Sequence, residues 1–161
     1  TNHNNSAMTR LKKKGVKRNM LKGIPSILSP ELLKVLDEMG HSDEIVIADG
    51  NFPGASHAQR LIRLDGHNVP EILNAVLQLF PLDRYVAAPV ALMEVVKGDP
   101  VVPVVWEEYK KIIAAHEEDI QIENIERFAF YERAKKAYAV ITTSEKALYA
   151  NIILKKGVVT E

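Results

Sequence analysis

The sequence contains no cysteine among its 161 residues. Disulfide bonds, thiolate nucleophiles and cysteine-ligated metal sites are therefore excluded, and nothing indicates an oxidising compartment. The chain also lacks any apolar run close to the roughly 18–20 residues that a membrane-spanning helix needs. Because hydrophobic residues make up 47% and charged residues 26% of the chain, the composition is typical of a globular protein, and we expect a soluble protein with no membrane partner.

Acidic residues are absent from residues 1–19, while the whole chain has a formal net charge of +0. This segment is therefore basic, and the rest of the chain is acidic by the same amount. Such a segment can be a nucleic-acid-binding arm, but because it is poor in apolar residues we interpret it as a basic leader or a cloning-derived tail. We predict one domain over residues 20–161 and no nucleic-acid partner. No apolar segment of a secretory signal follows the basic residues, which favours a cytoplasmic protein.

Several motifs that identify cofactor enzymes are missing. No Gly-rich dinucleotide loop follows a predicted strand, and there is no phosphate-binding loop and no Gly-x-Ser-x-Gly motif. The histidines lack the paired spacing of metal ligands; they are His3, His41, His57, His67 and His116. We therefore expect no cofactor and no metal, and a pocket in such a protein suits reactions driven by proton transfer alone.

Helical and strand patterns alternate along the rest of the chain. The spacing of apolar residues predicts helices at residues 30–39, 70–80, 106–118 and 128–137. Ser29 can cap the first helix and Gly40 can end it. Short apolar runs predict strands at residues 44–48, 61–64, 89–96, 138–142 and 152–154. The alternation predicts an α/β fold, a single layered domain with a mixed, mostly parallel sheet flanked by helices.

Two polar residues bracket the predicted strand 44–48. His41 follows the helix stop, and Asp49 follows the last residue of the strand. Asp49 thus lies at the carboxyl end of a strand, where open α/β sheets bind ligands, although Asp-Gly-Asn is also typical of a simple turn. His41 can bond the last carbonyls of the helix. A histidine and a carboxylate brought together at a strand edge can also act as a general acid–base pair.

Two further segments combine polar and aromatic residues. The segment "ERFAFYERAKKAYAV", residues 126–140, places Arg127 and Tyr131 beside aromatic rings. It can be a solvated helix with a buried aromatic face, but arginine donors and an apolar platform also suit a sugar site. The segment "YANIILKKG", residues 149–157, places Tyr149 and Asn151 directly before an apolar strand, which alone indicates no specific ligand.

Together, three segments resemble the ribose pyranase/fucose mutarotase family, in particular its fucose mutarotase branch. They are "LKGIPSILSPELLKVLDEMGHSDEIVIADGNFP", "RFAFYERAKKAYAV" and "YANIILKKGV". The resemblance runs from about Met20 to the C-terminus. It implies a cofactor-free isomerase that interconverts the α- and β-anomers of the monosaccharide L-fucose by general acid–base ring opening and closure. A ribose pyranase, which interconverts pyranose and furanose ribose, and a non-catalytic monosaccharide-binding module are the alternatives.

The resemblance also implies roles for individual residues. His41 would be the proton donor, with Tyr131 or a water molecule as its counterpart, while Asp49 and Arg127 would bind sugar hydroxyls. The remaining predicted sugar-binding residues are Asp83, Tyr149, Ala150 and Asn151. Fucose mutarotases usually have glycine where this chain has Ala150, and alanine there is typical of the ribose pyranases. The segment "FAFYERAKKA" is of the fucose type and favours L-fucose.

Members of this family are ring-shaped oligomers, commonly decamers, with sites between subunits. The resemblance therefore implies a homo-oligomer, a decameric ring, in which a neighbouring subunit supplies the Tyr-x-Asn segment. We further expect His41 and Asp49 to line one pocket, with Asp49 close enough to orient the imidazole of His41.

Overall fold

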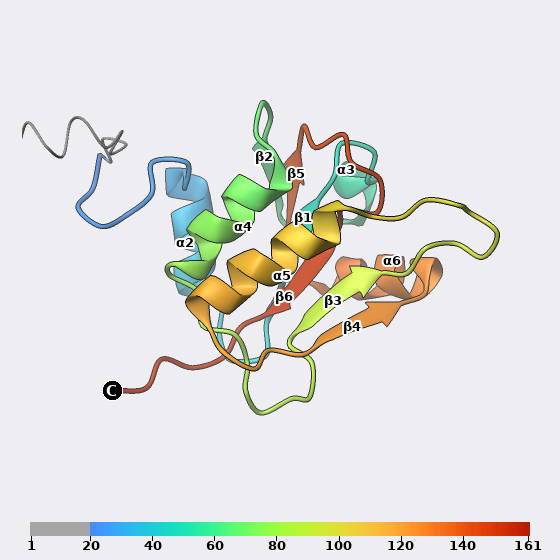
Figure 1. Cartoon of the computed structure of the whole chain (residues 1–161). Coiled ribbons are helices and arrows are strands. Elements are labelled where there is room, and N and C mark those ends of the chain that lie inside the picture. The colour runs from blue at the N-terminus through green and yellow to red at the C-terminus, as the bar shows by residue number, and fades with distance from the viewer. Residues whose placement is uncertain (1–19) are drawn as a thin grey trace, which may run out of the picture.

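The computed structural model describes residues 20–161, so the predicted basic leader at residues 1–19 lies outside the described residues. The described chain forms one six-stranded sheet with helices on both faces (Figure 1). Its strands are β1 (Glu44–Ala48), β2 (Leu61–Leu64), β3 (Val90–Met93), β4 (Ile122–Ile125), β5 (Ala139–Thr143) and β6 (Ile152–Lys155). Their order across the sheet is β2-β5-β1-β6-β3-β4.

Of the strands in residues 20–161, only β6 runs against the others. It pairs antiparallel with β1 on one side and with β3 on the other. The pairs β1–β5, β2–β5 and β3–β4 are parallel. The predicted mixed, mostly parallel sheet is therefore confirmed. The parallel strands all end at one edge, which we call the carboxyl edge, and β6 begins there. They all begin at the opposite edge, which we call the amino edge.

Helices cover both faces of the sheet (Figure 1). One face is covered by α2 (Pro30–Glu38), α4 (Val69–Leu77) and α5 (Val105–His116), and the other by α3 (Gly54–His57) and α6 (Arg127–Lys136). Every predicted helix and strand is present, and each end lies within three residues of its predicted position. Helix α3 and strand β4 were not predicted. A single turn such as α3 has no periodicity to detect, and β4 is an edge strand whose Glu123 and Asn124 interrupt any apolar run.

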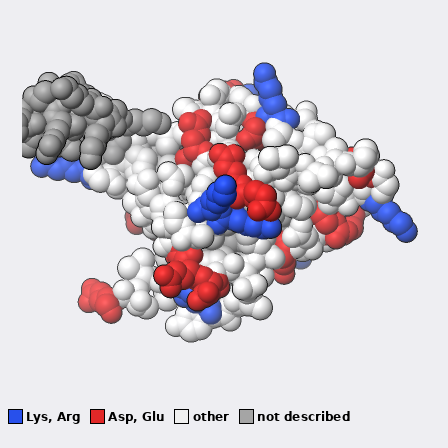
Figure 2. Space-filling view, in the orientation of Figure 1, with Lys and Arg blue, Asp and Glu red and all other residues white. Residues whose placement is uncertain are grey.

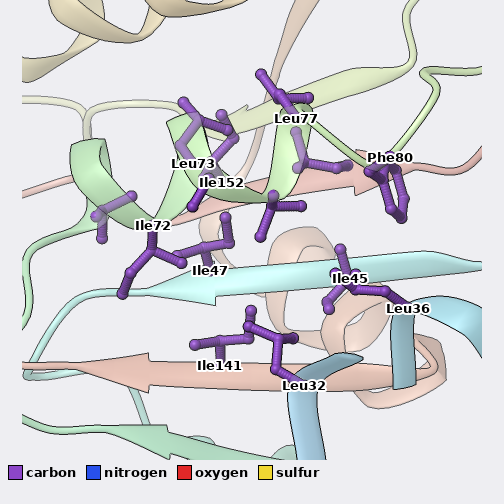
Figure 3. Packing of buried hydrophobic residues seen from close by; sticks show 14 of the residues in the cluster. Leu32, Leu36, Ile45, Ile47, Ile72, Leu73, Leu77, Phe80, Ile141 and Ile152 are labelled. Atoms are coloured by element: carbon purple, nitrogen blue, oxygen red, sulfur yellow. The ribbon is translucent and has the colours of Figure 1, made fainter. Parts of the chain in front are cut away.

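The larger hydrophobic cluster lies between the sheet and helices α2, α4 and α5. Figure 3 shows its members interdigitating, among them Leu32, Leu36, Ile45, Ile47, Ile72, Leu73 and Ile141. Along β1, Ile45 and Ile47 face this cluster, whereas Val46 and Ala48 face a smaller cluster beneath α6. All four of these side chains are fully buried. Burial on both faces explains why β1 is apolar throughout, and it holds the strand rigidly at the centre of the sheet.

Candidate functional site

Polar side chains from separate segments converge at the carboxyl edge of the sheet. Asp49 directly follows β1, and Asn151 directly precedes β6. Arg127 is the second residue after the end of β4. Because parallel strands end at the same edge, residues far apart in sequence meet there. They line a cavity of about 210 Å³ with Asn51, Phe52, Met93, Val96, Asp99, Tyr131, Leu148 and Tyr149. This volume lies below the roughly 300–1,000 Å³ of sites for drug-sized molecules, so the cavity suits a small ligand.

Asp49 is fixed at the inner end of this cavity. Its N–H donates to Oδ1 of Asn151 at 2.7 Å, and its own Oδ1 accepts the N–H of Asn51 at 3.0 Å. Burial raises the pKa of the Asp49 carboxyl above its ordinary value, and hydrogen bonds from the N–H groups of Asn51, Phe52 and Ala150 oppose that rise only in part. The result is a buried carboxylate with fixed orientation, which can accept hydrogen bonds from ligand hydroxyls.

The segment from Tyr149 to Asn151 is anchored from behind by α5. The indole N–H of Trp106 donates to the carbonyl of Tyr149, and the hydroxyl of Tyr109 donates to the carbonyl of Ala150, both at 2.7 Å. Burial raises the pKa of Tyr109, so its hydroxyl stays a donor. Tyr149 has φ +57°, a left-handed conformation that residues other than glycine rarely adopt. The two anchors hold the chain in this conformation.

Ala150, predicted to contact the sugar, lies behind the cavity. Its side chain is fully buried in the larger hydrophobic cluster, and it is not among the lining residues. Its backbone N–H bonds the carboxylate of Asp49. Ala150 therefore acts on the cavity through its backbone N–H and not through its side chain. The extra methyl group relative to glycine does not narrow the space for a ligand.

The ring of Tyr149 is held by the loop between β3 and α5. Its hydroxyl donates to Oδ2 of Asp99 at 2.5 Å and accepts the N–H of Val96 at 3.3 Å. Figure 1 shows this loop, in yellow, reaching beyond the arrowheads of β3 and β4. The bond to Asp99 raises the pKa of Tyr149 and lowers that of Asp99. Since the hydroxyl hydrogen is committed to Asp99, Tyr149 can only accept a hydrogen bond from a ligand.

Helix α6 supplies the cation and an aromatic wall. Glu126 caps the helix by accepting N–H groups at its start, and Arg127 follows as the first helical residue. The guanidinium of Arg127 lies 4.6 Å from the ring centroid of Phe128. One turn along, Tyr131 packs edge-on against Phe52, with ring centroids 5.6 Å apart. Arg127 and Tyr131 thus both line the cavity, and their predicted roles toward a sugar stay predictions.

His41 lies at the amino edge and not in this cavity. It precedes β1 and Asp49 follows it, and a strand of five residues spans roughly 16 Å. Within one chain, the expectation that His41 and Asp49 line one pocket is therefore wrong, and Asp49 does not orient the imidazole. The physical reason is strand direction, because residues before and after a strand lie at opposite edges of the sheet.

Asp83, predicted to contact sugar, also lies at the amino edge, where it bonds His41. The Nε2 atom of His41 is 3.0 Å from Oδ1 of Asp83, and the imidazole ring centroid is 5.3 Å from that of Tyr85. Asp83 is only 1% exposed, whereas the side chain of His41 is 41% exposed. The structure therefore pairs a buried carboxylate with an accessible imidazole.

The last carbonyls of α2 do not need His41 as a partner. The ammonium of Lys156 donates to the carbonyls of Leu36 at 2.7 Å and Met39 at 2.6 Å. These bonds fill the structural role that a histidine after a helix end can play. His41 is therefore not needed to cap α2, and its imidazole contacts Asp83 instead.

The Tyr-x-Asn segment shares its cavity with Asp49 and Arg127 of the same chain. This corrects the expectation that a neighbour supplies Tyr149 and Asn151 to the cavity that holds Asp49. If two copies share one site, the group that must come from the neighbour is His41.

A larger hollow, of about 1,060 Å³, lies between α4 and α5. It is a broad groove with Glu71, Glu107, Glu108 and Lys111 among its lining residues. Figure 2 shows acidic and basic side chains mixed on the visible face, so the groove offers no extended charge of one sign. We place the site in the smaller cavity, because the strand ends bring the buried Asp49 and Asn151 together there with Arg127.

The described part of the chain holds no group of three or more histidine, aspartate and glutamate side chains placed to bind a metal. Likewise, none of the helices in residues 20–161 has both the length and the apolar character needed to cross a membrane.

Known proteins resemble this chain over most of its length. Residues 22–159 match the RbsD / FucU transport protein family. The fucose mutarotase of Homo sapiens is 53% identical over 144 residues, which cover 86% of this chain and 94% of that protein. The L-fucose mutarotase of Actinobacillus pleuropneumoniae serotype 5b (strain L20) is 51% identical over 140 residues, which cover 86% of this chain and 97% of that protein.

Solved structures agree with these sequence matches. The crystal structure of the fucose mutarotase from Streptococcus pneumoniae in complex with L-fucose has a TM-score of 0.84 and 55% identity, covering 87% of this chain and 100% of that one. Bacillus subtilis RbsD complexed with D-ribose has a TM-score of 0.65 and 25% identity, covering 89% of this chain and 98% of that one. The fold is therefore common to both structures, and the sequence is nearer to the L-fucose complex.

The anchoring of the Tyr149–Asn151 segment predicts unequal effects for two Tyr→Phe substitutions. Tyr109→Phe removes the donor to a buried carbonyl and should lower the free energy of unfolding by about 1–3 kcal/mol. Tyr138→Phe removes a hydroxyl that donates to the exposed Glu38 and should cost less. Urea titration followed by circular dichroism measures both. Equal losses would show that the bond from Tyr109 does not anchor the segment.

Proposed function

Because this chain belongs to the RbsD / FucU transport protein family, we propose that it is an isomerase that interconverts the α- and β-anomers of L-fucose. The observation that carries the proposal is the 55% identity to a fucose mutarotase bound to L-fucose, with a TM-score of 0.84. The 25% identity to RbsD bound to D-ribose gives the ribose reaction less support, and the curated relatives at 51–53% identity are named fucose mutarotases.

Mutarotation opens the sugar ring at C1 and closes it on the other face of the resulting carbonyl. In ring opening, a base takes the proton of the anomeric hydroxyl, and its O–H electron pair forms the C=O bond. The bond between C1 and the ring oxygen breaks toward the ring oxygen, which takes a proton from an acid. Closure reverses these steps. Because only protons pass between sugar and protein, a histidine and one second proton carrier suffice.

The cavity at the carboxyl edge matches the donors and acceptors of a sugar. The carboxylate of Asp49 and the hydroxyl oxygen of Tyr149 accept hydrogen bonds, and the guanidinium of Arg127 donates them. Asn151 uses its Oδ1 atom for the N–H of Asp49, so its amide hydrogens remain for the ligand. Phe52 and Met93 line the same space and offer an apolar surface for sugar C–H groups. Tyr131 is the protein group we propose as the second proton carrier.

His41 reaches a sugar in this cavity only if a second copy supplies it. We propose that the amino edge of one copy meets the carboxyl edge of the next. Such head-to-tail contacts use two different surfaces and form a ring when the rotation from copy to copy closes. Both edges expose apolar side chains: Val96, Phe128 and Leu148 near the cavity, and Tyr85 and Val86 near His41. Exposed apolar residues of this kind mark interaction surfaces.

For the assembly we propose a homo-oligomeric ring, specifically the decamer that the family resemblance implies. For the location we propose the cytoplasm, because the chain has no cysteine to form the disulfides that are common in oxidising compartments. The ring proposal rests on the family resemblance and on the separation of His41 from the cavity, and the location proposal rests on the sequence alone.

Replacing His41 tests the proton-transfer step. His41→Ala should reduce enzyme-catalysed exchange between the L-fucose anomers by roughly 10²–10⁴-fold, the usual contribution of a general acid or base. Saturation-transfer NMR between the two anomeric proton signals measures this rate. His116→Ala, which changes a partly exposed histidine on α5 bonded to Asn74, is the matched control and should keep the wild-type rate. An undiminished rate in His41→Ala would remove His41 from the mechanism.

The raised pKa of Asp49 predicts how sugar binding depends on pH. Binding of L-fucose should weaken as Asp49 takes up a proton, at a pH above the ordinary aspartate value of 3.8. Acidification has the opposite effect on the free energy of unfolding. Because the folded chain binds this proton more tightly than the unfolded chain, protonation removes the cost of burying the Asp49 charge, so Asp49 does not cause acid unfolding.

Isothermal titration calorimetry across the acidic range measures the affinity, and circular dichroism verifies that the protein stays folded. The variant Asp49→Asn should bind more weakly and should lack this acid step. Affinity that stays constant through the pKa of the wild-type carboxyl would contradict the assignment of Asp49 as the hydroxyl acceptor.

A further inference from the structure

We propose that Asp83 is a positioning residue, which fixes His41 in the tautomer with hydrogen on Nε2 and makes Nδ1 the nitrogen that exchanges protons with the sugar. The inference rests on the proposed function, because it assigns an atom to the proton transfer that His41 performs. It differs from the role in sugar binding that the family resemblance implies for Asp83.

Asp83 is held firmly in place by backbone contacts. Its N–H donates to the carbonyl of Lys155, the last residue of β6, at 3.0 Å. Gly157 packs directly against the chain at this point: a Cβ there would stand 2.6 Å from the carbonyl oxygen of Leu82 and 2.9 Å from Cα of Asp83. The N–H of Gly157 donates to the carbonyl of Pro81 at 2.7 Å. The carboxylate therefore has a fixed position from which to orient the imidazole.

One oxygen of Asp83 accepts two hydrogen bonds. Oδ1 is 3.0 Å from Nε2 of His41 and 3.0 Å from the backbone nitrogen of Tyr85. Burial alone would raise the pKa of Asp83, but the N–H of Tyr85 and the imidazole of His41 together lower it below its ordinary value. The carboxyl is thus ionised at neutral pH and can only accept hydrogen bonds. Nε2 of His41 must therefore carry a hydrogen.

The other nitrogen of the imidazole is free. No hydrogen bond to Nδ1 of His41 is present within residues 20–161, and the side chain is 41% exposed. In the neutral imidazole Nδ1 bears the lone pair, so it takes the proton from the sugar and later returns it. The Asp83 carboxylate then lies beside the imidazolium that forms.

The remaining oxygen of Asp83 strengthens this assignment. Oδ2 is buried and has no hydrogen-bond partner. Buried polar atoms are nearly always bonded, and a catalytic role is one of the explanations for an exception. Here the charge of the carboxylate is offset mainly by the N–H of Tyr85, by His41 and by the more distant Lys155. The contact with Nε2 of His41 is therefore the main side-chain contact of this buried carboxylate.

Two substitutions separate the geometry of Asp83 from its charge. In Asp83→Asn, the amide oxygen can replace Oδ1 and accept from both His41 and Tyr85, so the tautomer should be kept while the charge is lost. In Asp83→Ala no acceptor remains, and the hydrogen of His41 should distribute between both ring nitrogens. Asp65→Ala, which removes an exposed carboxylate paired with Arg63, is the control.

The tautomer is measured by magic-angle-spinning ¹⁵N NMR of histidine-labelled protein, with the His41 signals identified by their absence in His41→Gln. Anomer exchange is measured over a range of L-fucose concentrations. We expect the Nε2–H tautomer in the wild type and in Asp83→Asn. In Asp83→Ala we expect a mixture of tautomers and a roughly 10- to 100-fold lower kcat, the range found for residues that orient a metal-bound histidine. KM should stay unchanged, and Asp83→Asn should lose less activity.

Three results would overturn the proposal. The first is a wild-type His41 with hydrogen on Nδ1. The second is an Asp83→Ala variant with both kcat and KM unchanged. The third is an Asp83→Ala variant with a raised KM at constant kcat, which would make Asp83 a sugar contact. If Asp83→Ala does not fold, the wild type and Asp83→Asn still decide, because loss of the Nε2–H tautomer in either contradicts the proposal. Failure of the proposed function is distinct: wild-type protein would not accelerate anomer exchange, whatever the tautomer of His41.

Discussion

The burial of β1 on both faces is the constraint on which the proposed site depends. Helices pack over Ile45 and Ile47 on one side and over Val46 and Ala48 on the other, while β5 and β6 bond both edges of the strand. A strand held in this way cannot bend to bring its two ends together. Asp49 and His41 therefore stay at opposite edges of the sheet. In the function we propose, sugar binding and proton transfer are divided between these edges, so the proposed active site needs two copies of the chain.

Each edge is built to hold its polar groups still. At the carboxyl edge, Trp106 and Tyr109 bond the backbone of the Tyr149–Asn151 segment, and Asp99 bonds the hydroxyl of Tyr149. At the amino edge, backbone bonds hold Asp83, which in turn holds His41. Fixed groups need little reorganisation when charge moves during a reaction. The same burial that raises the pKa of Asp49 leaves its carboxylate in one orientation, held by the N–H of Asn51.

Local patterns in the sequence predicted most of the fold but only part of the site. The apolar runs placed β1 at its observed bounds and β6 one residue short, because buried strands are apolar throughout. The reversed direction of β6 has no such signal, since a buried strand has the same pattern in either direction. Asp99, Trp106 and Tyr109 were missed as site residues because their partners lie about 40–50 residues away. The expectation that His41 and Asp49 share a pocket failed because it ignored strand direction.

The division of the site between two copies is tested most directly by mixing two inactive variants. His41→Ala lacks the proposed proton carrier and Arg127→Ala lacks the proposed sugar donor, so each variant alone should be nearly inactive. When both are co-expressed and purified as mixed oligomers, random assembly pairs an intact His41 with an intact Arg127 at about one site in four. Anomer exchange measured by saturation-transfer NMR should therefore recover to about a quarter of the wild-type rate. Mixed oligomers that stay as inactive as the separate variants would contradict a site shared between copies.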